Sequence, residues 1–323
     1  MKRKKESFIT KTKNFLTVLT LTTVMLFGLQ GYTDNSSNLK FVQISDVHFA
    51  KNGSNTTFKM IAETPKLLDD AIEQTNNINH LDFVMFSGDL IDKAYENELN
   101  TVLSHVQKLN TPWYFAFGNH DTCLGCHLSK KLYLNILRKN NPNFKFNTSY
   151  YSFIPKKGYK VIVLDSIIDT EITSNGYIDD KQLNWLDNEL NASQKDVVLI
   201  FLHMPIIEPF TSSDHMLKNS FVVKKTIEKY KNPIGVFSGH YHATKVIQNG
   251  NVLYVNSPAL VSYPNAFRLI EVTIKKNKAI FTLTYKETGL KNIQKLAKLL
   301  VFASSIYTGE EKDQNATYEI KMR

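Results

Sequence analysis

Short apolar runs of strand length alternate along this chain with segments of helical periodicity, and this pattern limits the fold most. Between the runs, apolar residues recur at helical spacing, as in Leu183, Leu186 and Leu190. Such an order is typical of a layered α/β domain, so we predict two stacked sheets, a β-sandwich, flanked by helices. The runs expected to form strands are 41–44, 83–86, 113–117, 159–164, 197–202, 234–237, 252–255, 267–274 and 279–283.

Length and hydrophobic content favour a single catalytic domain, which we place at 40–286. The chain has 323 residues, of which 42% are hydrophobic, enough for a substantial core. Its formal net charge of +9 is concentrated before residue 14, where basic residues exceed acidic ones by five. The small excess elsewhere gives no reason to expect nucleic acid as a stable partner.

The basic N-terminus is followed by an uncharged, largely apolar segment at 14–31. This order predicts a signal peptide or an N-terminal membrane anchor over 1–31, followed by a polar linker over 32–39. We therefore expect an exported protein that is periplasmic, exposed on the cell surface or extracellular. Where the segment is retained, it would attach the chain to a membrane.

Metal-ligand residue types follow five of the predicted strands. In open α/β sheets, functional side chains gather at the carboxyl ends of the strands, so these residues are expected to meet at one edge. Glycine precedes three of the groups, where the backbone must turn sharply or approach a ligand closely. The residues are Asp46, His48, Asp89, Asn119, His120, Asp121, His203, His240 and His242.

This donor set predicts a metal centre. Imidazole and carboxylate ligands suit first-row ions such as Mn, Fe, Zn or Co, and none of the strand ends supplies a thiolate. The candidate ligands number seven when His120 and Asp121 are set aside, more than one ion with room for a substrate would use. We therefore expect two metal ions as cofactors.

In order along the chain, these residues resemble the sequence blocks of the calcineurin-like metallophosphoesterases. A single block is common by chance, but five in order, each after a predicted strand, are specific. They span residues 46–242, and the resemblance implies the four-layer sandwich of that family. The blocks are Asp46-x-His48, Gly88-Asp89, Gly118-Asn119-His120-Asp121, His203 and Gly239-His240-x-His242.

The resemblance also implies a role for each ligand. It implies hydrolysis of phosphodiester or phosphomonoester bonds by a hydroxide that bridges the two ions. A shared carboxylate would hold these ions ~3.5–4 Å apart. The first ion would be bound by Asp46, His48 and His242, the second by Asn119, His203 and His240, and Asp89 would bridge both.

His120 would act from outside the metal shell, as a hydrogen-bond or proton donor to the phosphoester. Asp92 or Asp121 would orient its imidazole. Gly88-Asp89-Leu90-Ile91-Asp92 and His203-Met204-Pro205 resemble the branch that contains bacterial cyclic-nucleotide phosphodiesterases. This resemblance favours a small-molecule phosphoester substrate without selecting one.

Cys123 and Cys126, the only cysteines, precede His127 in the pattern that also attaches c-type haem. A local disulfide in an exported protein is the favoured interpretation, and a pair of free thiols is the simpler one. Two functions from other classes therefore stay open, a redox or haem protein centred on these cysteines and a non-catalytic metal-binding module.

The end of the chain, 287–323, is predicted to form a helix and a tail. Apolar residues recur at helical spacing over 289–307, and from Gly309 on the sequence is polar. Docking on the domain is the favoured interpretation of this helix, with contact at a membrane surface as the alternative. The residues expected to be buried are Ile293, Leu296, Leu300 and Ile306.

Overall fold

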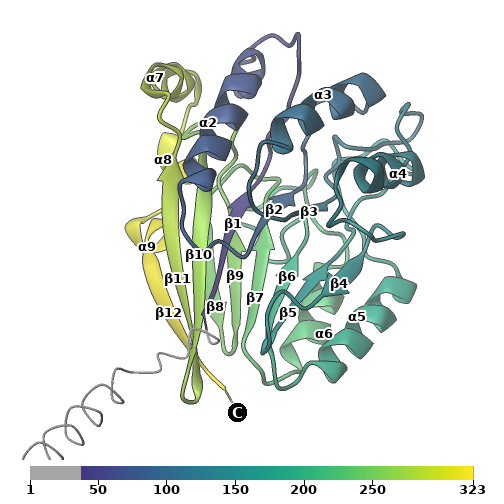
Figure 1. Ribbon diagram of the computed structural model, residues 1–323, viewed down its shortest axis with the longest axis vertical. Helices are drawn as coiled ribbons and strands as arrows, with labels where there is room; N and C mark the ends of the chain where they lie inside the picture. The colour runs from purple at the N-terminus through teal and green to yellow at the C-terminus, as the bar shows by residue number, and fades with distance from the viewer. Residues whose placement is uncertain (1–37, 323) are drawn as a thin grey trace, which may run out of the picture. The chain divides into compact units, whose positions relative to one another are not determined.

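The computed structural model describes residues 38–322 and contains two six-stranded sheets (Figure 1). The first sheet consists, in spatial order, of β12 (Ala316–Lys321), β11 (Lys278–Glu287), β10 (Ala266–Lys275), β1 (Asn38–Ile44), β2 (Phe83–Ser87) and β3 (Trp113–Ala116). The second consists of β4 (Tyr151–Phe153), β5 (Tyr159–Val163), β6 (Val197–Phe201), β7 (Ile234–Ser238), β9 (Val252–Asn256) and β8 (Lys245–Asn249).

The strands that carry the predicted ligands lie in the parallel parts of the two sheets. β1, β2 and β3 are parallel, as are β5, β6, β7 and β9, whereas the outer strands are antiparallel. β2, β6 and β7 are buried at every position, because helices cover one face and the other sheet covers the second. Parallel strands that end together bring their following loops to one edge.

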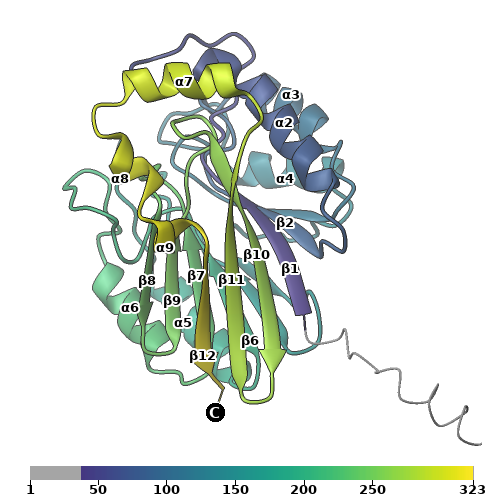
Figure 2. The ribbon, with the colours of Figure 1, turned by 90° about the vertical axis from the view of Figure 1, so that its left-hand side faces the viewer.

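Helices form the two outer layers of a four-layer sandwich (Figure 2). α2 (Thr64–Asn76), preceded by the 3-10 turn η2 (Ile61–Glu63), lies with α3 (Glu96–Val106) and α4 (Lys130–Asn140) on the first sheet. α5 (Asp180–Ala192) and α6 (Ser220–Glu228) cover the second sheet. The predicted fold class is confirmed.

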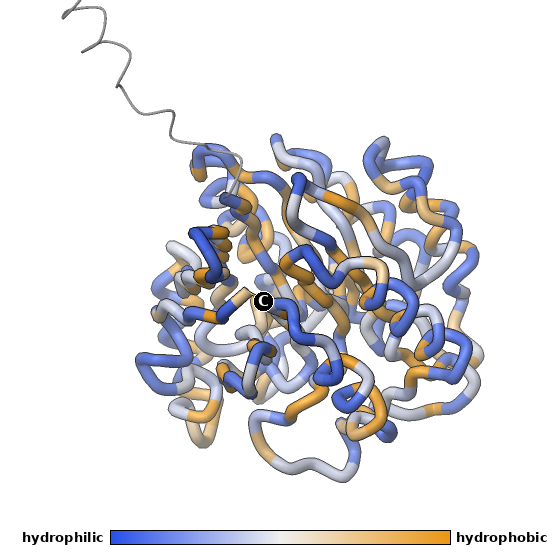
Figure 3. Tube along the Cα trace, turned by 90° about the horizontal axis from the view of Figure 1, so that it is seen from below, coloured by the Kyte–Doolittle hydropathy of each residue, from blue (hydrophilic) through white to orange (hydrophobic). Residues whose placement is uncertain are grey.

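The main core lies between the sheets. The ring of Phe41 in β1 stacks on Phe83 in β2 at 4.9 Å and meets Phe201 and Phe237 of the second sheet at 5.5 and 5.3 Å. Apolar residues follow the strands through the interior (Figure 3). Because buried aromatic side chains contribute large apolar areas, these contacts fix the two sheets against each other.

The C-terminal prediction was wrong in two respects. The segment divides into α7 (Lys291–Leu300), α8 (Ser304–Thr308) and α9 (Glu311–Gln314), and the predicted tail contains β12, which pairs with β11. Of the residues expected to be buried, Leu296, Leu300 and Ile306 are exposed and Ile293 is only partly buried. Gln294 and Ala297 face the domain instead.

The tail is ordered because it satisfies buried polar groups of the domain. The Asp313 carboxylate accepts hydrogen bonds from the Val246 amide and from Lys245. The fully buried Arg268 donates to the backbone oxygens of Asp313 and Gln314. The polar C-terminal segment is therefore part of the folded domain, because it supplies hydrogen-bond partners to buried groups.

The N-terminal segment 1–31 and the linker 32–39 lie outside the described residues, except for the linker's last two residues, which begin β1. Within 38–322, no helix combines the length and the apolar character needed to cross a bilayer.

Candidate metal centre

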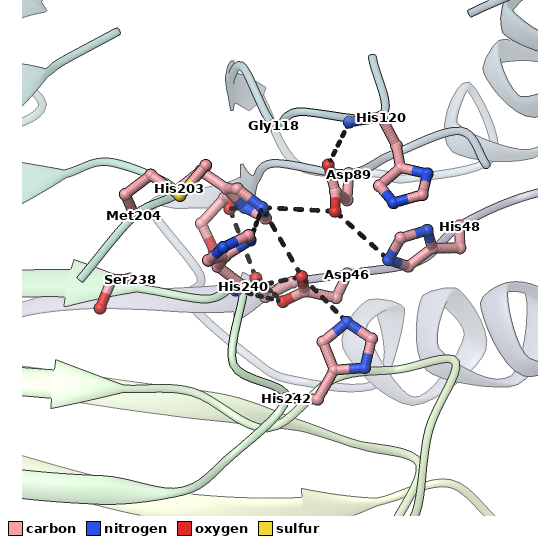
Figure 4. A network of polar contacts seen from close by, with 12 residues as sticks. Asp46, His48, Asp89, Gly118, His120, His203, Met204, Ser238, His240 and His242 are labelled. Carbon is pink, nitrogen blue, oxygen red and sulfur yellow. Dashed lines mark hydrogen bonds and ion pairs between the residues drawn. The ribbon is translucent and has the colours of Figure 1, made fainter. Parts of the chain in front are cut away.

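All five ligand-bearing segments meet beyond the ends of β1, β2, β3, β6 and β7 (Figure 4). In five of the ligands the backbone is left-handed, with φ between 46° and 70°, a conformation that costs a non-glycine residue about 1–3 kcal/mol. Such strain clusters at functional sites. These ligands are Asp46, His48, Asp89, His240 and His242.

Two glycines allow the loops to approach one another. A Cβ atom at Gly118 would overlap the backbone and carboxylate of Asp89, and one at Gly88 would overlap the His203 ring. Gly88 also has φ of 96°, which favours glycine. The predicted close approach at these two positions is confirmed.

The ligand atoms form two groups. Asp46, His48 and His242 are buried, and each offers an atom within 4.8 Å of the others. His242 Nε2 lies 3.4 Å from Asp46 Oδ1.

The second group is as compact, and consists of Asp89, His203 and His240. His203 Nε2 lies 3.3 Å from Asp89 Oδ2 and 3.2 Å from His240 Nδ1. Two imidazoles and a carboxylate this close together can serve as ligands of one cation.

Asp89 links the two groups. Its Oδ2 atom is 3.3 Å from Nε2 of His48 and 3.3 Å from Nε2 of His203, one histidine from each group (Figure 4). Its Oδ1 atom accepts a hydrogen bond of 2.8 Å from the His120 amide. One carboxylate therefore faces both candidate ion positions while the backbone fixes its orientation.

Three of the imidazoles are held through Nδ1 by polar atoms of neighbouring segments. A partner on Nδ1 fixes the ring and leaves Nε2 directed at the centre, as in metal sites whose histidines are oriented by outer groups. The contacts join His48 to Asp92 Oδ1 at 3.3 Å, His203 to the Ser87 carbonyl at 3.0 Å and His242 to Ser262 Oγ at 2.7 Å.

The residues fit a cation on physical grounds. His48 Nε2, His240 Nε2 and Asn119 Oδ1 are buried and have no hydrogen-bond partner within the described part of the chain. Leaving such atoms unpaired costs about 1–3 kcal/mol each. All three are good ligands of first-row ions, and a bound cation would satisfy them.

Electrostatics keeps most of the imidazoles neutral. Burial lowers the pKa of His48 and His240 well below 6.5, and it lowers the pKa of His242. Burial also opposes charge on His203, but the nearby Asp89 and Asp46 outweigh it and raise the pKa of His203 to about 9. Neutral imidazoles have the free lone pair that a metal requires.

His120 lies at the rim of the centre. Its ring is 4.4 Å from the His48 ring, and its Nδ1 atom lies 2.8 Å from the backbone oxygen of Asp92. The Asp92 carboxylate is farther from this nitrogen, at 3.9 Å, than from Nδ1 of His48. Of the two predicted alternatives, Asp92 is therefore the one that contacts His120. It does so through its carbonyl, while its carboxylate contacts the ligand His48.

Asp121, the other predicted alternative for orienting His120, lies against backbone amides instead. Its buried carboxylate accepts hydrogen bonds from the amides of Leu90, Ile91 and Gly118. Burial and the neighbouring Asp89 raise the pKa of Asp121 to about 8, against the effect of the amides. Asp121 thus joins the loops that carry Asp89 and His120.

Lys59 was not predicted, although its ammonium lies inside the centre. Nζ is 3.2 Å from His48 Nδ1 and 3.4 Å from His120 Nε2. Burial lowers the pKa of Lys59, against the raising effect of the three site carboxylates. Its neighbours Phe58 and Met60, apolar residues in a polar loop, are the sequence signal that this loop folds back onto the domain.

Cys123 and Cys126 form a disulfide beside the site, as the favoured interpretation predicted. The bridge leaves neither sulfur free for the thioether bonds of a c-type haem. His127 stacks against Tyr95, with ring centroids 5.2 Å apart.

Two cavities adjoin the centre. One of about 810 Å³ lies between the loops at 50–61 and 92–98 and is lined by Lys59. The other, of about 320 Å³, lies between His120 and the disulfide loop. Asp92, Lys93 and Tyr95 line both, so there is room for a ligand on this side of His120.

Known proteins are similar to this chain in sequence or in fold. A probable cyclic nucleotide phosphodiesterase from Xenorhabdus bovienii is 23% identical over 226 residues, which are 69% of this chain and 86% of that protein. A probable glycerophosphodiester phosphodiesterase from Arcobacter nitrofigilis is 25% identical over 215 residues, 62% of this chain and 71% of that protein. A solved dimetal phosphatase from Danio rerio has a similar fold, with a TM-score of 0.61 at 18% identity, covering 77% of this chain and 96% of that one.

The family of calcineurin-like phosphoesterases matches residues 39–244, well over half of the chain. The matched region contains every strand end at which a predicted ligand lies, and the clustered histidines and aspartates are able to bind metal. This chain belongs to the calcineurin-like phosphoesterase family and is a metal-dependent phosphoester hydrolase.

Proposed function

We propose that the protein is an exported phosphodiesterase that holds two metal ions and hydrolyses a small phosphodiester. The position of Asp89 carries this proposal, because its Oδ2 atom lies 3.3 Å from a histidine of each ligand group. One shared carboxylate between two sets of imidazoles is an arrangement that suits a pair of divalent cations. Mn, Fe, Zn and Co all suit the donor set.

In this proposal each group binds one ion and Asp89 contacts both. Bound cations would lower the pKa of a water and polarise the phosphoryl group. The first ligand set is Asp46, His48 and His242, and the second is Asn119, His203 and His240.

His120 and Lys59 then face the substrate from the same side. With Nδ1 held by the Asp92 carbonyl, protonated His120 presents Nε2–H to the leaving oxygen and donates its proton as the ester bond breaks. The Lys59 ammonium, 3.4 Å from that nitrogen, donates hydrogen bonds to a non-bridging phosphoryl oxygen. The two groups thereby divide the negative charge of the reacting phosphate between them.

The cavity beside His120 suits the leaving group. It contains Lys93, Tyr95 and His127, a cation and two stacked rings, and so offers contacts to a polar or planar alcohol. Two of the relatives are a probable cyclic nucleotide phosphodiesterase and a probable glycerophosphodiester phosphodiesterase. We therefore favour small diesters of this kind over monoesters.

Export is proposed from the sequence of residues 1–31, which has a basic head and an uncharged apolar stretch. The Cys123–Cys126 disulfide supports the same compartment, because disulfides persist in oxidising surroundings. A periplasmic, cell-surface or extracellular position follows.

Hydrolysis of bis-p-nitrophenyl phosphate tests the activity. The chain is freed of metal, reloaded in turn with Mn, Fe, Zn and Mg, and assayed beside Asp89→Asn and His120→Ala. We expect two ions per chain in the active form, loss of metal in Asp89→Asn, and retained metal with a rate lower by about 10²–10⁴ in His120→Ala. A single ion at full activity would contradict the dinuclear assignment, and a metal-loaded chain inert toward every diester would contradict the function.

A further inference from the structure

The segment around α7 and α8 exposes more large apolar side chains than any other stretch of comparable length in the described chain. Thirteen large hydrophobic residues are exposed within 38–322, and five of them lie between residues 296 and 306. Leu299 is 83% exposed and Phe302 is fully exposed. We call this set the apolar face; it consists of Leu296, Leu299, Leu300, Phe302 and Ile306. Large apolar side chains exposed together in one short segment mark an interaction surface.

α7 has three distinct sides. Gln294 and Ala297 point into the domain, where Gln294 Nε2 donates to the backbone oxygens of Pro264 and Thr288. At 100° per residue, Leu296, Leu299 and Leu300 cluster on another side, away from that anchor. The helix is therefore fixed to the domain with an apolar side left toward solvent.

Lysines flank the apolar face on one edge of the helix. The lysines are Lys291, Lys295 and Lys298. Lys291 forms an ion pair of 2.8 Å with Glu287, whereas Lys295 and Lys298 pair with no acidic side chain in the described part of the chain. All three lysines are exposed. An apolar side bordered by basic residues is the pattern of a helix that lies in the plane of an anionic membrane surface.

The apolar face lies at the same end of the molecule as the metal centre. Figure 2 shows α7 crossing the end of the sandwich toward which β1 runs. The Tyr307 ring in α8 contacts Phe58 at 5.3 Å, and Phe58 stacks on the ligand His242 at 5.0 Å. Two aromatic contacts thus connect the exposed segment with the site.

We propose that the apolar face rests on an anionic lipid surface and holds the metal centre toward it. The leucines and Phe302 enter the headgroup region to a depth of about 5–10 Å, and the three lysines contact lipid phosphates. α7, with ten residues, lies on the surface without crossing it. The lysines stand at the border between the apolar face and water, where headgroup phosphates would be.

Charge decides between a lipid surface and a second copy of the chain. In a twofold contact the same patch meets itself, so Lys295 and Lys298, which pair with no acidic side chain in the described part of the chain, would face their own copies. An anionic bilayer offers both the apolar layer and the opposite charge. The lipid surface is therefore the occupant that satisfies both features of the segment.

Tryptophan emission at defined positions tests the contact in the full chain. Leu299→Trp places the probe on the apolar face, and Phe221→Trp places a matched probe at a 76% exposed position in α6, away from α7 in both ribbon views (Figures 1 and 2). Both variants are mixed with vesicles of phosphatidylcholine and phosphatidylglycerol that carry brominated acyl chains. Emission of the parent chain, with Trp113 and Trp185, is subtracted.

We expect the probe at 299 to shift to the blue and lose about half or more of its emission, while the probe at 221 is unchanged. Changing Lys291, Lys295 and Lys298 to glutamine should weaken the contact at 299 about fivefold per lysine. The measurement needs neither metal nor substrate, so its result is independent of the phosphodiesterase assignment.

Three results would overturn the proposal. A chain that sediments with vesicles while the probe at 299 keeps its emission would show attachment through another segment. Equal quenching at 299 and 221 would show unspecific adsorption. A blue shift at 299 that appears without vesicles and grows with protein concentration would show that a second copy covers the apolar face.

Discussion

Replacing Asp92 by asparagine separates the metal centre from the proton donor. The change keeps the size of the side chain and the backbone carbonyl but removes the carboxylate charge. That carboxylate lies 3.3 Å from Nδ1 of His48, whereas His120 is held by the backbone oxygen at 2.8 Å. Asp92→Asn should therefore disturb a metal ligand and leave the orientation of His120 intact.

The expected magnitude follows from that contact. Removing the outer partner of a metal-binding histidine costs about 10–100-fold in metal affinity, or about 1.4–2.8 kcal/mol. The affinity for Mn or Zn is measured by competition with a coloured chelator. At saturating metal, kcat for bis-p-nitrophenyl phosphate should stay within about threefold of the parent value, because the Asp92 carbonyl still holds His120.

Asp69→Asn is the matched control, because its carboxylate contacts Nδ1 of His105 at 2.8 Å between α2 and α3. This variant should leave metal affinity unchanged. If Asp92→Asn kept full metal affinity but lowered kcat at saturating metal by about 10²-fold or more, the carboxylate would serve His120 and the inference from the distances would be wrong.

Three further outcomes are expected. The Lys59→Gln variant should bind cations more tightly in a metal titration, because a positive charge is removed from the centre. Its kcat/KM should nevertheless fall about 10–100-fold in steady-state kinetics, because a hydrogen-bond donor to the phosphoryl group is lost. The free energy of unfolding of the metal-free protein, measured in urea, should decrease as the pH falls from 7 to 5. The loss is up to about 2 kcal/mol for each buried histidine with a lowered pKa, because these histidines bind protons near pH 6.5 in the unfolded chain but stay neutral in the folded chain. His203, whose pKa is raised to about 9, has the opposite effect. The folded chain holds this proton throughout the range, whereas the unfolded chain binds it only near pH 6.5, so His203 adds about 1 kcal/mol of stability over the same fall in pH and offsets part of the loss. Asp121→Ala should destabilise the fold by about 2–4 kcal/mol in urea melts, because three buried amides lose their acceptor.

The ligand set can be predicted from the sequence because each ligand is marked by a local sequence pattern. Each ligand follows a short apolar run, and parallel strands deliver their ends to one edge whatever the rest of the fold does. The family resemblance implied Asp46, His48 and His242 for one ion, Asn119, His203 and His240 for the other, and Asp89 as the bridge. The structure groups Asp46 with His48 and His242, and Asp89 with His203 and His240. Asn119 stands beside them as a buried oxygen without a partner in the described chain.

The roles of Asp92, Asp121 and Lys59 depend on contacts that no local pattern encodes. Asp92 and Asp121 each follow a ligand residue closely in the sequence. Asp121 does not contact His120, because its carboxylate accepts hydrogen bonds from the backbone amides of Leu90 and Gly118. Lys59 reaches the centre because a loop far from any strand end folds back onto it. In α7, apolar periodicity identifies a helix, but it does not tell which side of that helix faces the domain.

The metal centre combines strain and unpaired polar atoms in a region that the two sheets hold rigidly. The Asp46 amide donates to the Gly88 carbonyl at 3.1 Å and the His48 amide donates to the Asp89 carbonyl at 2.8 Å, so the pairing of β1 with β2 continues into the ligand loops. These bonds fix left-handed residues that would relax if the loops were free. Because Asp89 belongs to both the paired backbone and the two ligand groups, a displacement of either group moves the other. Cation binding at one position should therefore order the second.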